Sequence, residues 1–366
     1  MRIRPHRRWW HSAPHFASVS ISSPVPFRLL SVATISLSLA LPSLAQSAAN
    51  AAWMVTIVLP PKVVAGQLAT LAVFGADGKL ASGVTVEVAK DERVVTDTTG
   101  RAAFTARADG SVMIAKSSGK AAAALVDPAG QVSGPQTISL APVISLKDSF
   151  SICGGGFRGE ADANRVKINE ERALILAASP ECLIVLPGQK VAPGPASISV
   201  ETGGAHWSAA TLLVSLEFEP PQPALVPEKK SKLILRAEGT EQPLLLVAEN
   251  QTPGVLGFLR GDTQKLRTSG GVNNTVAIEV HAIRSGDYSF HARLVPPADT
   301  ATAERYLRAA SSIAPRELQH RLENLANRLN RHPRDVEKVQ RELGQVISTT
   351  IAGDLRTLLE SADAAL

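Results

Sequence analysis

Residues 142–204 are divided into short strand-like segments, which turn-forming residues interrupt about every ten positions. Val166-Lys167-Ile168 alternates apolar and polar side chains, and Ile198 to Val200 does the same near the end of the stretch. The apolar run that begins at Cys182 stops at Pro187-Gly188, and a turn at Pro193-Gly194-Pro195 precedes Ile198. Short alternating strands with frequent turns are typical of a small antiparallel β-sandwich, so we expect one here.

Three consecutive glycines, Gly154 to Gly156, precede the large apolar side chain of Phe157. A phosphate-binding loop needs a Gly-Lys-Ser or Gly-Lys-Thr sequence that opens a helix, and neither that lysine nor a helical pattern follows Gly156. Glycine is unfavourable in a strand interior unless the backbone bulges or approaches another chain segment closely. The glycines therefore indicate a structural feature of the sandwich.

The order of these features resembles the IPT/TIG family of immunoglobulin-like domains over residues 142–204. The residues that carry the resemblance are Gly154, Gly156, Phe157, Val166, Ile168, Ser179, Pro180, Pro187, Gly194, Pro195, Ile198 and Val200. The sequence departs from the family pattern at the Glu170-Glu171 turn and in its two cysteines. The resemblance implies a binding or spacer module, and it transfers no catalytic residue.

Cys153 and Cys182 are the two cysteines of the chain, and both lie inside this stretch. In an oxidising compartment, an even pair within one small domain predicts a disulfide. A shared metal site and two buried free thiols are the alternatives, and the sequence near the pair supplies no histidine for a metal.

Residues 51–127 show a second set of strand and turn signals, including the alternating valines Val84, Val86 and Val88. This stretch resembles bacterial immunoglobulin-like domains of the invasin type. The matching residues are Gly66, Asp77, Gly78, Gly83, Val84, Thr96, Asp97 and Gly100. A third sandwich is predicted over residues 211–296, and a proline-rich bend or linker from Pro220 to Pro227 lies within this range.

From residue 299 onward the apolar period changes from two to about 3.6, which predicts a helical tail over residues 299–366. Leucines at helical spacing form a stripe at Leu318, Leu322, Leu325 and Leu329. Pro333 opens another helix, whose apolar residues continue at the same spacing from Val336 to Leu358. Such stripes either bury one another and dock on a neighbouring domain, or form a coiled coil with a partner or a second copy. The predicted fold is therefore mainly β, with tandem immunoglobulin-like sandwiches followed by a helical hairpin or small bundle.

Residues 1–45 read as a signal peptide, because arginines precede a run of apolar and small residues. Cleavage is expected near Ala45, and an uncleaved membrane anchor is the alternative. The segment holds five of the 38 basic residues and no acidic one, so 38 − 5 = 33 basic residues face 33 acidic residues in the remainder. That balance argues against nucleic-acid binding. We expect a periplasmic, secreted or surface location, and no membrane span in the mature chain.

The mature sequence contains no recognisable catalytic motif, and we predict no catalytic, cofactor-binding or metal-binding residue. The leading hypothesis is a non-enzymatic scaffold or protein-binding module at the cell envelope, with an envelope or extracellular protein as partner and possible self-association through the helical tail. A carbohydrate-binding protein is the first alternative. It would use the few mature Trp and Tyr residues, Trp53, Trp207, Tyr288 and Tyr306. A hydrolase with a dispersed active site is the second alternative.

Overall fold

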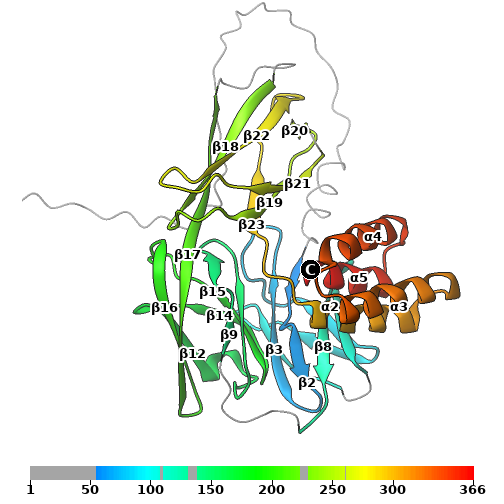
Figure 1. Cartoon of the computed structure of the whole chain (residues 1–366). Helices are drawn as coiled ribbons and strands as arrows, with labels where there is room; N and C mark the ends of the chain where they lie inside the picture. The colour runs from blue at the N-terminus through cyan, green and yellow to red at the C-terminus, as the bar shows by residue number, and fades with distance from the viewer. Residues whose placement is uncertain (1–54, 108–109, 131–137, 223–229, 260) are drawn as a thin grey trace, which may run out of the picture. The chain divides into compact units, whose positions relative to one another are not determined.

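The computed structural model describes residues 55–107, 110–130, 138–259 except 223–229, and 261–366 (Figure 1). It contains mostly antiparallel β-sheets, with parallel pairs at β2–β8 and β10–β17, followed by four C-terminal helices. The predicted mainly β fold with a small helical bundle is confirmed. The chain forms two compact units. The larger covers the described residues up to 216, residues 238–241 and residues 294–366, and the smaller covers 217–237 and 242–293.

The first sandwich of the larger unit follows the alternating pattern of its valines. Val86 and Val88 are buried in one strand, while Glu87 between them is only half-buried. One layer contains β1 (Thr56–Val58), β3 (Leu68–Phe74) and β6 (Arg101–Thr105). The other layer has the order β2 (Lys62–Val64), β8 (Lys120–Asp127), β7 (Val112–Ser117), β4 (Thr85–Ala89) and β5 (Glu92–Val95). Apolar side chains of both layers meet in a common core.

The second sandwich packs Phe157, Val166, Ile168, Ile198 and Val200 into its own core, as their alternation predicts. One layer has the order β9 (Ser139–Leu140), β11 (Phe150–Cys153), β15 (Cys182–Leu186) and β14 (Leu174–Ala178). The other layer contains β13 (Glu171–Arg172), β12 (Asn164–Ile168), β16 (Gly194–Thr202), β17 (Ala205–Gln222) and β10 (Val143–Ser145). A short 3-10 turn, η1 (Ala161–Ala163), precedes β12.

The two sandwiches share a sheet, because β14 of the second sandwich pairs with β3 of the first at Ala178 and Thr70. A separate small core lies at this joint, where Ala72 contacts a group that includes Leu176 and Ile184. The Thr70 hydroxyl donates a 2.7 Å hydrogen bond to the Gly159 carbonyl oxygen, and it accepts one from the Ala161 amide. The two sandwiches are therefore packed together as one body.

The smaller unit contains the next six strands and its own aromatic core. Its strands are β18 (Lys230–Glu238), β19 (Leu245–Asn250), β20 (Leu256–Phe258), β21 (Thr263–Arg267), β22 (Thr275–Ala282) and β23 (Phe290–Leu294). Strand β22 pairs with β18 and β20, and β19 lies between β21 and β23. Phe290 stacks on Phe258 at a ring-centroid distance of 5.3 Å and also contacts Tyr288, which gives Tyr288 a structural role. Strand β17 runs without a break through residues 211–216. The division of residues 51–366 into four domains stays a prediction.

Four helices form the C-terminal bundle: α2 (Thr300–Ile313), α3 (Arg316–Arg331), α4 (Val336–Thr349) and α5 (Asp354–Ala364). The Asp299 side chain caps α2 by accepting a hydrogen bond from the Thr302 amide, and Pro315 occupies the cap position of α3. Leu322, Leu325 and Leu329 of the predicted stripe are buried in a core that also contains Leu125 of β8. The bundle thus packs internally and on the first sandwich.

The sequence pattern predicts one helix after Pro333, but the structure breaks it into α4 and α5. Gly353, at the cap of α5, has a φ of 146°, which lies outside the helical region and favours glycine. Among the described residues, no helix combines the length and apolar character that a membrane crossing requires.

Candidate functional site

The cysteine pair lies in register on two neighbouring strands of the second sandwich. Cys153 ends β11, Cys182 begins β15, and the two residues are direct antiparallel partners with Cα atoms 4.2 Å apart. The structure joins them in a disulfide that spans 29 residues of sequence. In the chain-entropy description, closing a loop of that length stabilises the fold by about 3–4 kcal/mol.

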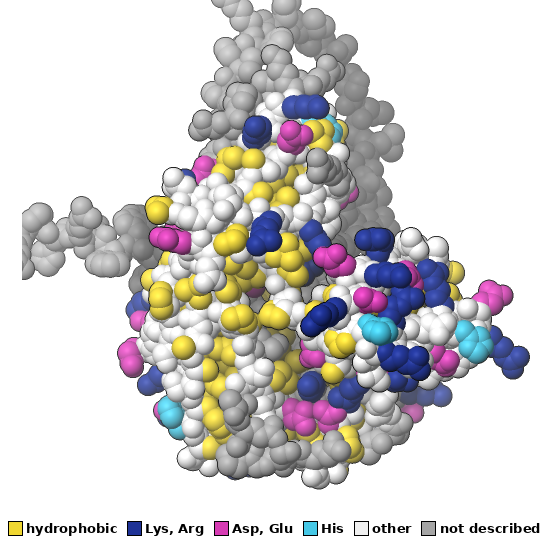
Figure 2. All heavy atoms as spheres, viewed as in Figure 1, with side chains coloured by type: hydrophobic (Ala, Val, Ile, Leu, Met, Phe, Trp, Pro, Cys, Tyr) yellow, Lys and Arg dark blue, Asp and Glu magenta, His cyan; other side chains and the backbone are white. Residues whose placement is uncertain are grey.

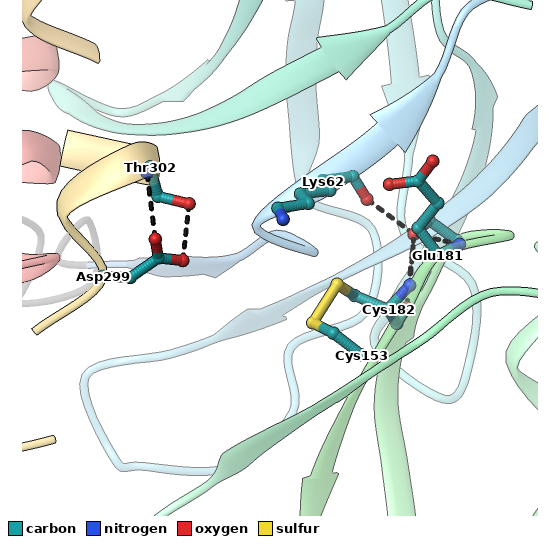
Figure 3. The surroundings of a disulfide bond; sticks show 7 residues. Lys62, Cys153, Glu181, Cys182, Asp299 and Thr302 are labelled. Carbon is teal, nitrogen blue, oxygen red and sulfur yellow. Dashed lines mark hydrogen bonds between the residues drawn. A yellow bond between two sulfur atoms is a disulfide. The ribbon is translucent and has the colours of Figure 1, made fainter. Parts of the chain in front are cut away.

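The turn that precedes Cys182 connects the disulfide to the first sandwich (Figure 3). Ser179 is fully buried, and its hydroxyl donates a 2.6 Å hydrogen bond to the carbonyl oxygen of Lys62 in β2. The same hydroxyl accepts a 3.0 Å hydrogen bond from the Cys182 amide. The Gly154 amide donates to the Glu181 carbonyl oxygen, so the glycine run is also held by this turn.

Helix α2 reaches the same place from the helical bundle. Arg305 Nη2 lies 2.6 Å from Asp127 Oδ1, and it donates a 3.2 Å hydrogen bond to the Val126 carbonyl oxygen. The Asp127 side chain is only 14% exposed, so this ion pair is partly shielded from water. Tyr306, the next residue of α2, is buried and donates its hydroxyl proton to the carbonyl oxygen of Ala123. Burial raises the pKa of Tyr306 to about 12.

Four charged residues from three parts of the fold meet here, and we call them the charged junction: Lys62, Asp127, Glu181 and Arg305. Partial burial and the neighbouring Asp127 carboxylate raise the pKa of Glu181 from 4.5 to about 7, and the charges of Lys62 and Arg305 oppose that increase. Burial disfavours the ionised form of a carboxyl group, and a like charge disfavours it further. Glu181 therefore titrates near neutral pH.

No sequence motif marks any of these four residues as part of a site. They lie on β2, at the end of β8, in the turn before β15 and on α2, and no local motif connects them. Ser179-Pro180 lies next to Glu181 and is a turn signal, which indicates only where a strand ends. A carboxyl group that titrates near neutrality can serve as a general acid or base, but this one lies where three parts of the same chain pack together.

The aromatic residues considered for sugar binding do not form an exposed platform among the described residues. Trp207 is half-buried, and its ring meets the edge of Phe157 at a centroid distance of 5.6 Å. Tyr306 of α2 is buried in the core of the helical bundle, and Tyr288 packs on Phe290. Trp53 lies outside the described residues.

Three other features of the described residues give weaker candidate sites than the charged junction. Within the described ranges, no group of three or more His, Cys, Asp or Glu side chains could hold a metal ion. The ring of His281 lies directly over Gly257, where a Cβ atom would come within 2.4 Å of it, so His281 packs against its partner strand. An open hollow of about 330 Å³ lies between α2 and α3 and is lined by polar side chains such as Arg308, Ser311 and Asn327.

No family model matches the chain, and no curated protein matches its sequence. Similar solved structures include the Bacteroides ovatus protein SGBP-B of a mixed-linkage glucan utilization locus, in complex with a mixed-linkage heptasaccharide. The match has 9% identity, covers 65% of this chain and 73% of that chain, and has a TM-score of 0.24. The I9–I11 tandem of titin matches at 12% identity over 65% of this chain and 95% of its own, with a TM-score of 0.19. Domains 4–9 of surface layer protein SbsC match at 11% identity over 68% and 50%, with a TM-score of 0.22. Likeness at these scores supports no inference about family or function.

Proposed function

We propose that the chain is an exported, non-enzymatic protein that acts as a scaffold or protein-binding module at the cell envelope. The observation that carries this proposal is the Cys153–Cys182 disulfide inside the second sandwich. Disulfides of this structural kind form and persist in oxidising compartments and are rare in the cytosol of mesophiles. The signal peptide proposed for residues 1–45, with cleavage near Ala45, agrees with that setting but lies outside the described residues.

The proposal extends to the type of each module. We assign residues 51–127 to a bacterial immunoglobulin-like sandwich, 142–204 to an IPT/TIG-like sandwich, 211–296 to a third sandwich and 299–366 to a helical tail. Modules of this type present broad faces and strand edges, to which protein partners can bind by adding a strand or covering a face. Figure 2 shows many Lys and Arg side chains over the helical bundle, with fewer Asp and Glu side chains among them. Some of these basic side chains are paired with acidic ones, as in Arg328–Glu342 and Arg356–Glu360.

The packing of the described Trp and Tyr residues favours a protein partner over a glycan. Sugar-binding faces present exposed aromatic rings, whereas Trp207 and Tyr306 are engaged in packing within the chain. The hydrolase alternative named no catalytic residue. Glu181 has a raised pKa, but it lies among residues that hold the fold together.

A binding experiment with the mature chain tests the proposal. Residues 46–366 are produced with the disulfide formed and used as bait for envelope extract of the source organism, in parallel with insoluble polysaccharides. A bait carrying Cys153→Ser and Cys182→Ser is the matched control. We expect a protein partner whose purified form binds saturably in physiological salt. Retention on polysaccharide without any protein partner would contradict the proposal, as would two free thiols in the protein isolated under denaturing, non-reducing conditions.

A further inference from the structure

Helices α3 and α4 form a hairpin on the outer side of the bundle, because the contacts with β7 and β8 of the first sandwich come from α2 and α5. Arg328 Nη1 of α3 lies 2.6 Å from Glu342 Oε1 of α4. Arg321 Nη2 donates a 3.4 Å hydrogen bond to Gln345 Oε1, so the two helices adjoin along these faces. We call the six basic residues of the adjoining faces and of the turn between them the basic face: Arg321, Arg328, Arg331, Arg334, Lys338 and Arg341.

Helical spacing places the members of the basic face on one side of the hairpin. Arg331 follows Arg328 by three positions in α3, and Arg341 follows Lys338 by three positions in α4. Residues three or four positions apart lie on the same face of a helix. The side chains that cross from α3 to α4 belong to these faces, so the basic residues of both helices border one surface.

The basic face holds more positive than negative charge. In residues 321–342 its six basic side chains stand against three acidic ones, Asp335, Glu337 and Glu342, which leaves an excess of three positive charges. Glu323 lies on the other side of α3, where it accepts a 3.4 Å hydrogen bond from the Ser311 hydroxyl of α2. Four members of the face are exposed and form no ion pair with any described residue: Arg331, Arg334, Lys338 and Arg341.

The stability of α4 does not explain the basic residues near its start. Arg334 lies just before α4, and Lys338 lies in its first turn. The N-terminal end of a helix carries a partial positive charge, so a cation is unfavourable there. Lys338 also lies one turn from Arg341, and like charges at that spacing repel each other. These two cations oppose folding and have no acidic partner in the described chain, so we expect their negative counterpart outside it.

We propose that the basic face docks the protein on an anionic phospholipid surface. Two adjoining helices present a broad strip of cations, which matches the extended negative charge of lipid headgroups better than a single acidic side chain. Each basic residue near such a surface raises binding by roughly fivefold, so an excess of three gives roughly a hundredfold. This attachment goes beyond protein binding, and it rests on the proposed location at the cell envelope.

The attachment is electrostatic and reversible. In residues 316–349, which include all of α3 and α4, no large apolar side chain is exposed. Stable insertion into a bilayer needs such side chains, whereas attraction between basic residues and headgroups does not. Figure 2 shows the many Lys and Arg side chains on the surface of the bundle. Binding should therefore weaken strongly as salt screens these charges.

Sedimentation with lipid vesicles tests the attachment. Residues 46–366 are used, because residues 1–45 carry five arginines of their own. The vesicles contain phosphatidylglycerol and phosphatidylcholine in equal parts, or phosphatidylcholine alone. At about 50 mM salt, where the screening length exceeds roughly 10 Å, we expect roughly hundredfold tighter binding to the vesicles with phosphatidylglycerol. At about 500 mM salt the difference should disappear.

The double variant Arg334→Glu with Lys338→Glu identifies the face. Both side chains are exposed, and glutamate is favourable near a helix N-terminus, so the variant should be at least as stable in urea as wild type. It should lose the preference for phosphatidylglycerol. Arg165→Glu with Lys167→Glu makes the same change in net charge at exposed positions of β12, and this control should bind as wild type does.

Three results would overturn the proposal: no preference of wild type for phosphatidylglycerol, binding that persists at high salt, or equal losses in the two double variants. A fourth would replace it with another partner. If wild type ignores both kinds of vesicle, and an envelope protein that binds it is lost on Arg334→Glu with Lys338→Glu, the face binds an acidic protein. Vesicle binding involves no partner protein, so the scaffold proposal stands or falls with the bait experiment alone.

Discussion

A methyl group added at Gly159 should disrupt the joint between the two sandwiches. Gly159 lies in the loop between β11 and η1, and a Cβ atom placed there would be 1.8 Å from the Leu68 carbonyl oxygen and 2.4 Å from the Leu68 carbonyl carbon. Those atoms belong to the backbone of β3 and cannot rotate away as a side chain could. The φ of Gly159 is outside the left-handed region, so the effect of Gly159→Ala is steric.

The size of the effect follows from what must move. Either the loop retreats from β3 or β3 shifts within its sheet, and overpacking of this kind costs about 1–3 kcal/mol. A retreating loop also breaks the hydrogen bonds that connect Thr70 with Gly159 and Ala161, worth about 1 kcal/mol each. We therefore expect Gly159→Ala to lower the free energy of unfolding by about 3–5 kcal/mol.

Urea unfolding followed by circular dichroism measures this loss, and Gly344→Ala is the matched control. Gly344 lies within α4, where a Cβ atom would have no neighbour within 4 Å. Alanine at an open helical position should therefore stabilise the protein by about 0.5–1 kcal/mol. If Gly159→Ala unfolds within about 0.5 kcal/mol of wild type, the size usual for neutral surface changes, the described contact between the loop and β3 is wrong.

Three further predictions concern the disulfide, the helical bundle and the tyrosines. Replacing both cysteines (Cys153→Ser with Cys182→Ser) should lower the free energy of unfolding by about 3–4 kcal/mol under non-reducing conditions, and an unchanged urea midpoint would contradict this. Leu325→Ala removes a side chain that is 1% exposed in the bundle core and should cost about 2–5 kcal/mol, whereas Ile351→Ala, at 88% exposure, should change stability little in the same assay. Absorbance titration at alkaline pH should show no tyrosine ionising at the ordinary value of 10, because burial raises the pKa of Tyr288 and raises that of Tyr306 to about 12. The folded state then holds protons that the unfolded chain has lost, so stability should fall as the pH rises from 10 to 12, and Tyr306→Phe should reduce that fall.

Local patterns predicted most of the elements because the relevant forces act over a few residues. Alternation at Val166 to Ile168 and at Ile198 to Val200 gave buried strands, and the leucine stripe around Leu325 gave a buried helix face. The break between α4 and α5 was missed because apolar residues continue at helical spacing across Gly353. The disulfide was predictable because the two cysteines are alone in the chain.

The junction and the shared sheet could not be predicted in the same way. Thr70 and Ala178 are 108 positions apart, and nothing in either strand marks the other as its partner. Glu181 resembles any surface glutamate in sequence, and its raised pKa comes from burial by distant segments and from Asp127. Such features depend on which surfaces meet in three dimensions, and a single sequence does not encode that choice locally.

The small core at the joint makes the two sandwiches one thermodynamic unit. Leu176 and Ile184 of the second sandwich are 1% and 7% exposed because Ala72 and its neighbours cover them. The second sandwich alone would leave these two side chains exposed to water. A fragment cut between residues 127 and 138 would present these side chains to water and would tend to self-associate. Heating should melt both sandwiches in a single cooperative transition. The unit that folds cooperatively is therefore larger than one sandwich.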